Sequence, residues 1–355
     1  MLSASHRFFL SPPLFGIDKV QELPPPPWTN ELAAELKFPY EVLEAALSDV
    51  KADSLHFYFT KRAFYLPEYG QHVVPILIQE ERCKVPVYSR HVRATIRNLE
   101  TKPFLGFNLH RRMGRLEALQ SFEYTRDWFL HAMSAVAMNR SHRGWPTPVR
   151  KEPFTITLPL GYHSQVEIPQ KSMAERKLDI SFAGNIKHPV PVTSYRYWLS
   201  TSKFLTRTQL YQELEYLKET GRWNIYLQES HASQFAGAAE VNQTYSELMM
   251  DTRICVSPRG SIAETFRSYE GLRAGCLVVG NRVPKSSFLA RAPILVVDHW
   301  KELESILDQY ARDTDFLEEA RSRSLDFWNT HLTPWRLARM VSAQLNRAGE
   351  TLLNP

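Results

Sequence analysis

The sequence predicts an α/β protein with two parallel-sheet domains, preceded by a proline-rich and helical extension. Short runs rich in β-branched and aromatic residues alternate with amphipathic segments of helical length, which is the pattern of βαβ units. The chain has 355 residues, enough for two domains of ordinary size. Its 43% hydrophobic and 23% charged residues are typical of a soluble globular protein.

The extension is expected to cover residues 1–54 and the first domain residues 55–165. ELPPPPWTN predicts a polyproline II arm on the surface, and ELAAELKF and PYEVLEAALSDV predict two helical stretches after it. The expected helix against the first sheet is EALQSFEYTRDWFLHAMSAVAM, whose apolar residues recur three and four positions apart. The strands expected in this domain are LHFYFT, VVPILIQ, PFLGFNLH and FTITLPLGYH.

The second domain is expected at residues 176–335, where the alternation is more regular. Its expected strands are LDISFAGNI, WNIYLQ, RICVSP, CLVVG and PILVVD. The segments expected to be helical are RTQLYQELEYLKETG, YSELMMDT, AETFRSYEGLRAG, WKELESILDQYA and DTDFLEEARSRSLDFWNT. A last amphipathic helix with a basic face is expected at residues 336–355.

Composition narrows the class of partner. The net charge of +5 and pI near 9.0 suit an acidic or phosphorylated ligand, but the basic residues are scattered, so we expect no nucleic acid. Three cysteines without CxxC spacing predict neither disulfides nor a zinc site, and Cys255 and Cys276 are expected to be small buried hydrophobes. No apolar run approaches the roughly 20 residues that span a bilayer. We therefore expect no transmembrane segment and a cytoplasmic protein, and the oligomeric state stays open.

The stretch RICVSPRGSIAETFRSYEGLRAGCLVVGN places charged residues between two strands that are expected to be buried. The loop Ser257–Ser261 follows the first of these strands, and ligands of open parallel sheets bind outside the carboxyl ends of the strands. The next helix offers free N–H groups and a positive dipole end to a phosphate. Gly260 allows close backbone approach, and Arg259 can contact a phosphate oxygen.

Three charged residues of the following helix are spaced for one face. Glu264, Arg267 and Glu270 are three positions apart, so their side chains are neighbours on a helix. A cation suits a diphosphate and a carboxylate suits ribose hydroxyls, so the combination predicts a nucleotide-sugar site. The alternative is a surface ion-pair ladder. The position between two core strands favours the functional interpretation.

The segment from Cys255 to Asn281 resembles the C-terminal half of exostosin-type glycosyltransferases, a Leloir family of GT-B architecture. The shared features are a strand, a Pro-Arg-Gly turn, an Arg three residues before an acidic residue, and Ala-Gly-Cys before an apolar strand. LDISFAGNI, FTITLPLGYH and VPKSSFLARAPILVVDHWKELESIL resemble flanking segments of the family. The resemblance covers roughly residues 153–310, and Leu277–Val279 replaces a more usual Ile/Val-Pro-Val.

This resemblance implies two Rossmann-like domains that face a central cleft, and a last helix that crosses back to the first domain. It implies transfer of a sugar from a nucleotide diphosphate sugar, with a UDP-sugar as the expected donor, to a glycan or glycoconjugate hydroxyl. Inversion, no essential metal and no tightly bound cofactor are also expected. The donor-site residues it implies are Arg259 and Arg267 at the diphosphate, Glu270 at the ribose, and Gly184 and Asn185 at the border of the cleft. Ser257, Gly260 and Ser261 are expected in the same site from the position of their loop.

An inverting transferase needs a general base, which is expected from the first domain. Glu80, Glu81 and His110 are candidates because each follows an expected strand, and His163 near the hinge is a further one. The base stays unassigned. One alternative function is a transferase that uses a CMP-activated acid sugar, with His188 before a proline as its weak signal. The other is a nucleotide-binding α/β module without catalysis. Peripheral membrane contact through the last helix is also left open.

Overall fold

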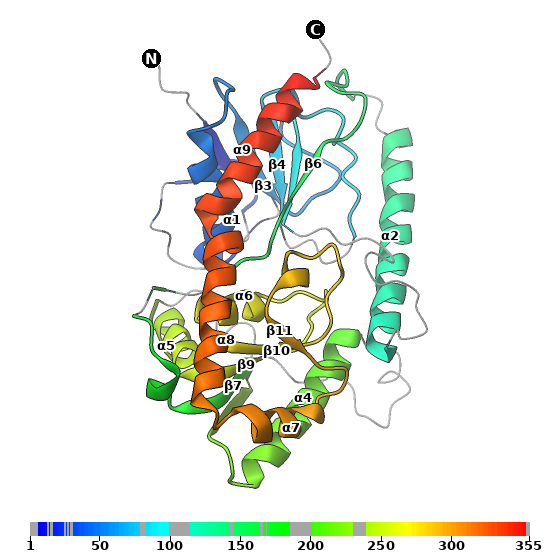
Figure 1. Ribbon diagram of the computed structural model, residues 1–355. Helices are drawn as coiled ribbons and strands as arrows, with labels where there is room; N and C mark the ends of the chain where they lie inside the picture. Colours follow the sequence, from blue (N-terminus) through cyan, green and yellow to red (C-terminus); the bar gives the residue numbers. More distant parts are fainter. Residues whose placement is uncertain are drawn as a thin grey trace.

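The computed structural model contains two α/β units, one above the other in Figure 1. The predicted α/β class with parallel sheets is confirmed. The residues that the structure describes are 6–12, 14, 17–24, 26, 28, 31–78, 83–98, 114–141, 145–163, 166–167, 169–184, 201–229 and 239–352.

The upper unit is built on a sheet of order β2-β1-β3-β4-β5-β6. All neighbouring pairs are parallel except β1 with β2. The strands are β1 (Arg7–Leu10), β2 (Gln21–Glu22), β3 (His56–Thr60), β4 (Val73–Leu77), β5 (Thr95–Asn98) and β6 (Thr155–Leu158), and the helices are α1 (Glu31–Leu47) and α2 (Arg115–Ser141).

The expectation of a separate arm over residues 1–54 needs correction. The strand β1 pairs with β3 because its aromatic residues find partners there: the Phe8 ring stacks on Phe57 at 5.0 Å and the Phe9 ring on Tyr58 at 4.8 Å. The two helical stretches expected after the arm form the single helix α1, with Pro39 inside it. The strand expected at PFLGFNLH lies outside the described residues.

The lower unit is built on a parallel sheet of order β11-β10-β9-β7-β8. Its strands are β7 (Leu178–Gly184), β8 (Ile225–Glu229), β9 (Thr252–Ser257), β10 (Leu277–Gly280) and β11 (Ile294–Val296). Its helices are α4 (Ser202–Glu219), α5 (Ala239–Met250), α6 (Phe266–Arg273), α7 (Glu302–Tyr310) and α8 (Thr314–Phe327). The shorter turns are η1 (Met173–Glu175), η3 (Phe288–Arg291) and the π-helical η4 (Trp328–Leu332).

The last helix, α9 (Pro334–Glu350), runs from the lower unit up along α1 (Figure 1). The side chain of Asn346 accepts from the backbone N–H of Lys51 at 2.8 Å, and Arg93 donates to the Leu345 carbonyl at 3.2 Å. The apolar residues Val341 and Leu345 are fully buried. The buried apolar residues in the upper part of α9 therefore pack against the first unit.

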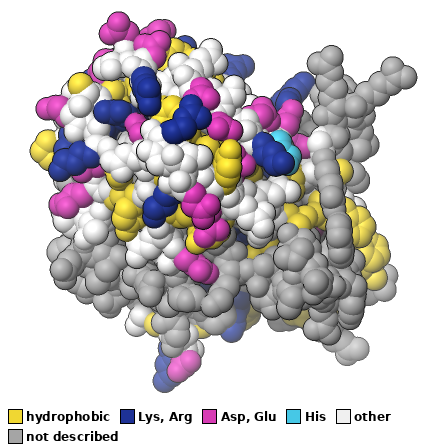
Figure 2. All heavy atoms as spheres, turned by 90° about the horizontal axis from the view of Figure 1, so that it is seen from below, with side chains coloured by type: hydrophobic (Ala, Val, Ile, Leu, Met, Phe, Trp, Pro, Cys, Tyr) yellow, Lys and Arg dark blue, Asp and Glu magenta, His cyan; other side chains and the backbone are white. Residues whose placement is uncertain are grey.

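The charges on the surface are mixed in sign, and the cysteines are buried. Lys and Arg side chains alternate with Asp and Glu over the described part of the face in Figure 2. Cys255 and Cys276 are buried as predicted, and burial raises the pKa of both thiols. Among the described residues, no helix combines the length and the apolar character needed to cross a membrane.

Candidate functional site

The strand order of the lower sheet creates a topological switch point at the carboxyl edge of that sheet. Counted along the chain, the order is 2-1-3-4-5, so the connections leave in opposite directions at β7 and β9. Open α/β sheets bind ligands at this topological switch point, outside the carboxyl ends of the two strands. The strand β7 ends at Gly184 and β9 at Ser257. Two of the predicted donor-site residues therefore border the switch point.

Arg267 reaches across this edge from the first turn of α6. Its Nη2 donates to the Ala183 carbonyl, and the guanidinium lies over the Phe182 ring at 4.7 Å from the centroid. A Cβ added at Gly184 would lie 3.1 Å from the Phe182 ring and 3.6 Å from Nη2 of Arg267. The glycine thus keeps the strand end open beside the cation. Gly184 and Arg267, both predicted, are neighbours.

Glu270 lies one turn further along α6 and is 3% exposed. Its Oε1 accepts from the backbone N–H of His163 at 3.1 Å, and its Oε2 accepts from the hydroxyl of Tyr245 at 2.8 Å. His163 follows β6 of the upper sheet, and its ring lies 5.0 Å from that of Phe266. The carboxylate therefore joins α6 to the chain that leaves the upper sheet.

The imidazole of His163 is partly buried beside this carboxylate. Burial lowers the pKa of His163 below 6.5, and the negative charge of Glu270 opposes that shift. The ring is therefore neutral at pH 7. A neutral imidazole can accept a proton, which is what a general base must do.

The helix α6 begins later than the sequence indicates. Thr265 is still extended, with φ −137°, and the helix starts at Phe266. Glu264 therefore lies in the preceding loop, where it accepts from the Tyr269 hydroxyl and where burial raises its pKa. The prediction that Glu264 shares a helix face with Arg267 and Glu270 is wrong.

The loop after β9 is held by its own side chains and by α2. Ser257 Oγ lies 2.7 Å from Oγ of Ser268 and is 4% exposed, so it joins the strand to α6. Gly260 donates its N–H to the Ile262 carbonyl at 2.9 Å, and a Cβ there would make ordinary contacts from 3.5 Å outward. The carbonyl of Ser261 accepts from Gln120 at 3.4 Å. The packing of the protein around position 260 therefore leaves room for a Cβ, and the role of Gly260 at a ligand stays a prediction.

Arg259 is placed differently from the prediction. It is 1% exposed, and its guanidinium donates to Gln120 Oε1 at 3.0 Å and to Glu117 Oε1 at 3.4 Å. Both partners belong to α2, which lies alongside both units in Figure 1. The expected diphosphate contact does not fit this arrangement, because the guanidinium is enclosed between α2 and the loop. Arg259 instead attaches the loop to α2.

Several predicted residues lie outside the described part of the chain. These are the candidate bases Glu80, Glu81 and His110, the donor-site residue Asn185, and His188. Their roles stay predictions. Conversely, Phe182 and Tyr245 belong to the site but carried no signal in the sequence, because a strand aromatic and a helix tyrosine usually fill a core.

Comparisons with known proteins add little. No family model and no curated protein matches the chain. One solved structure with a detectable likeness is a GtfA/B complex, at 11% identity and a TM-score of 0.37, covering 79% of this chain and 58% of that one. Another is AviGT4, a glycosyltransferase involved in avilamycin A biosynthesis, at 12% identity and a TM-score of 0.36, covering 95% of both chains. Likenesses this distant assign no activity to the chain.

Proposed function

We propose that the chain is a Leloir-type glycosyltransferase that binds a nucleotide diphosphate sugar at the β7/β9 switch point. The donor proposed is a UDP-sugar, and the acceptor is a hydroxyl of a glycan or glycoconjugate. Transfer is proposed to proceed with inversion, without an essential metal and without a tightly bound cofactor. The observation that carries the proposal is the position of Arg267 at the switch point, beside Gly184 and one turn before Glu270.

The donor is held by α6 in this proposal. The diphosphate lies between the guanidinium of Arg267 and the first N–H groups of the helix, where a cation and the positive dipole end both favour an anion. The ribose hydroxyls are proposed to bind Glu270. Its carboxylate is 3% exposed and accepts from the His163 N–H and the Tyr245 hydroxyl, so the ribose replaces one of these two donors. Positive groups fixed in advance stabilise the leaving diphosphate, usually the largest single contribution to catalysis.

His163 is the proposed general base among the described residues. It comes from the upper unit, its imidazole is neutral at pH 7, and its backbone contacts Glu270 of the lower unit. These properties match a group that removes the proton of an acceptor hydroxyl while the donor is held on the opposite side. Glu80, Glu81 and His110 remain the alternatives from the sequence.

The donor site is tested with a panel of UDP-, GDP- and CMP-sugars against wild type, Arg267→Ala and Glu270→Gln. A nucleotide at 100 times its Kd stabilises the folded protein by about 2.7 kcal/mol. We therefore expect one nucleotide class to raise the Tm of wild type by several degrees and to leave both variants unchanged. Thermal unfolding and donor hydrolysis are measured together.

Arg323→Ala is the matched control, because Arg323 is an exposed arginine of α8 that pairs with Glu319 at 3.8 Å. It should respond to the nucleotide as wild type does. The absence of a response to every nucleotide in folded wild type contradicts the proposal. Stabilisation without hydrolysis or transfer indicates a nucleotide-binding module, and a response confined to CMP-sugars indicates the acid-sugar transferase.

His163→Gln separates catalysis from donor binding. Glu270 is bonded to the backbone N–H of residue 163, so the substitution removes the imidazole and keeps that contact. We expect the transfer rate to fall about 10²–10⁴-fold, the usual contribution of a general base, with little change in the Kd of the donor. In wild type, kcat/KM should fall as the pH drops through the pKa of His163, below 6.5, because the protonated ring cannot accept a proton.

The transfer rate of wild type and of His163→Gln is measured as a function of acceptor concentration and of pH. If His163→Gln keeps the wild-type kcat, another residue is the general base. A variant that loses donor binding and transfer equally shows that the imidazole positions Glu270 and does not move the proton.

A further inference from the structure

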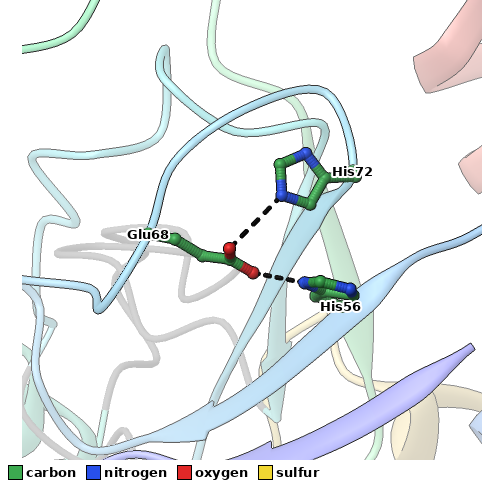
Figure 3. A group of neighbouring side chains, drawn as sticks. All are labelled: His56, Glu68 and His72. Carbon is green, nitrogen blue, oxygen red and sulfur yellow. Dashed lines mark hydrogen bonds and ion pairs between the residues drawn. The ribbon is translucent and has the colours of Figure 1, made fainter.

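Two histidines and a glutamate converge at the amino edge of the upper sheet (Figure 3). His56 is the first residue of β3, His72 directly precedes β4, and Glu68 lies in the connection between them. One ligand atom from each of the three lies within 4.8 Å of the others. The strand β3 rises about 3.3 Å per residue, so this edge is roughly 13 Å from its carboxyl end. The cluster is separate from the proposed donor site.

The carboxylate of Glu68 lies between the two imidazoles. Its Oε2 is 3.4 Å from Nε2 of His72, and its Oε1 contacts Nδ1 of His56. The two rings are perpendicular, with centroids 5.0 Å apart, so their nitrogens approach the carboxylate from different directions (Figure 3). The ligand atoms are therefore arranged around one point and not along a line.

Backbone contacts hold the two histidines in place. The N–H of His56 donates to the carbonyl of His72 at 2.8 Å, and His56 is paired with Val73 across the parallel strands. Gly70 has φ +143°, and a Cβ there would lie 2.9 Å from Cε1 of His72. Any larger residue at position 70 would displace the imidazole. The loop is thus shaped to let the His72 ring turn toward Glu68.

Two further side chains orient the cluster. The hydroxyl of Tyr58 donates to Oε1 of Glu68 at 2.8 Å, and the Phe9 ring packs edge-on against His56 at 5.4 Å. Hydrogen bonds of this kind to ligating carboxylates fix their direction in metal sites. The three cluster side chains are 23–45% exposed, so water can reach the point between them.

We propose that His56, Glu68 and His72 bind a divalent transition-metal ion, with zinc as the best match. Two imidazoles and one carboxylate are a known zinc ligand set, and the exposed side of the cluster leaves the fourth position to water. The ion ties the β3–β4 connection to the edge of the sheet. The spacing of these three residues gives no metal-binding signal in the sequence, because only the pairing of β3 with β4 brings His56 to the other two.

Titration of metal-free full-length protein with Zn²⁺ alone, followed by calorimetry, tests this site. We expect one saturable site in wild type and its loss in His56→Ala, His72→Ala and Glu68→Gln. Tyr58→Phe should keep the site and weaken it about 10-fold, the effect expected for a residue that orients a ligand. Zinc should also raise the Tm of wild type and not that of the three ligand variants.

Co²⁺ is the second probe, because its visible absorption reports the geometry of its ligands. His331→Ala is the matched control: it removes one exposed histidine elsewhere and should bind zinc as wild type does. Glu68→Gln keeps the shape of the side chain, so it decides the outcome if an alanine variant unfolds. No saturable zinc binding in wild type, or equal binding in folded Glu68→Gln, overturns the proposal.

Discussion

Arg259→Ala is expected to lower the free energy of unfolding by about 3–5 kcal/mol, as usual when one partner of a buried ion pair is removed. The side chain is 1% exposed and donates to Glu117 at 3.4 Å and to Gln120 at 3.0 Å. Its removal leaves the carboxylate of Glu117, which is 7% exposed, without this cation. Urea unfolding of wild type and variant measures the difference.

Glu117→Gln and the double variant complete a thermodynamic cycle with Arg259→Ala. If the pair is coupled, the double variant is destabilised by less than the sum of the two single variants. Arg222→Ala is the control, because its pairs with Glu304 and Asp308 are exposed and should contribute about 1 kcal/mol or less. A stable Arg259→Ala that has lost nucleotide binding would contradict this role and restore the predicted diphosphate contact.

For Arg259, the sequence pattern predicts a diphosphate as the partner, and the structure shows Glu117 and Gln120. A strand, a Pro-Arg-Gly turn and a helix place an arginine at the carboxyl edge of a sheet, and that placement is observed. Its partners lie 139 and 142 positions away, on α2. Local spacing cannot show whether a distant helix or a ligand occupies the space in front of the guanidinium.

For the sheets, the sequence pattern predicts individual strands and does not predict which strands pair. Alternation of apolar runs with helical segments predicted the strands β7 to β11 and the class of the fold, because each run carries its own burial pattern. The strand β5, with the sequence TIRN, was not predicted, since its buried Arg97 and Asn98 resemble a polar loop. The order that creates the switch point depends on pairing between distant strands, which no single segment encodes.

At the candidate site, local helix geometry accounts for one pair of neighbours. Arg267 and Glu270 are one turn apart on α6, so helix geometry alone places them together. Tyr245 and His163 reach Glu270 from α5 and from the chain after β6. The contact of Tyr245 follows from how α5 packs beside α6, and that of His163 from how the two units pack, and the spacing of residues reports neither.

Arg176→Ala is the second substitution for which a large loss of stability is expected. Arg176 is 1% exposed, and its guanidinium donates to the Thr252 carbonyl at 2.7 Å and to the Ala274 carbonyl at 2.5 Å. Ala274 is the C-cap of α6, and Thr252 begins β9. Truncation leaves these two carbonyls, and that of Lys171 at 3.3 Å, without this donor and opens a cavity, which together should cost about 3–5 kcal/mol. Thermal and urea unfolding measure the loss.

Arg176→Lys should recover less than half of that loss, because an ammonium group on a flexible stem cannot reproduce the planar fork that reaches both carbonyls. Lys177→Ala, one position along and exposed, is the control and should change stability by about 0.5 kcal/mol or less. The helix that Arg176 holds at its C-terminal end carries Arg267 and Glu270. Weaker nucleotide binding by Arg176→Ala at a temperature where it is still folded would therefore show that the position of α6 sets donor affinity. Unchanged binding would mean that the Tyr245 and His163 contacts of Glu270 hold the helix without it.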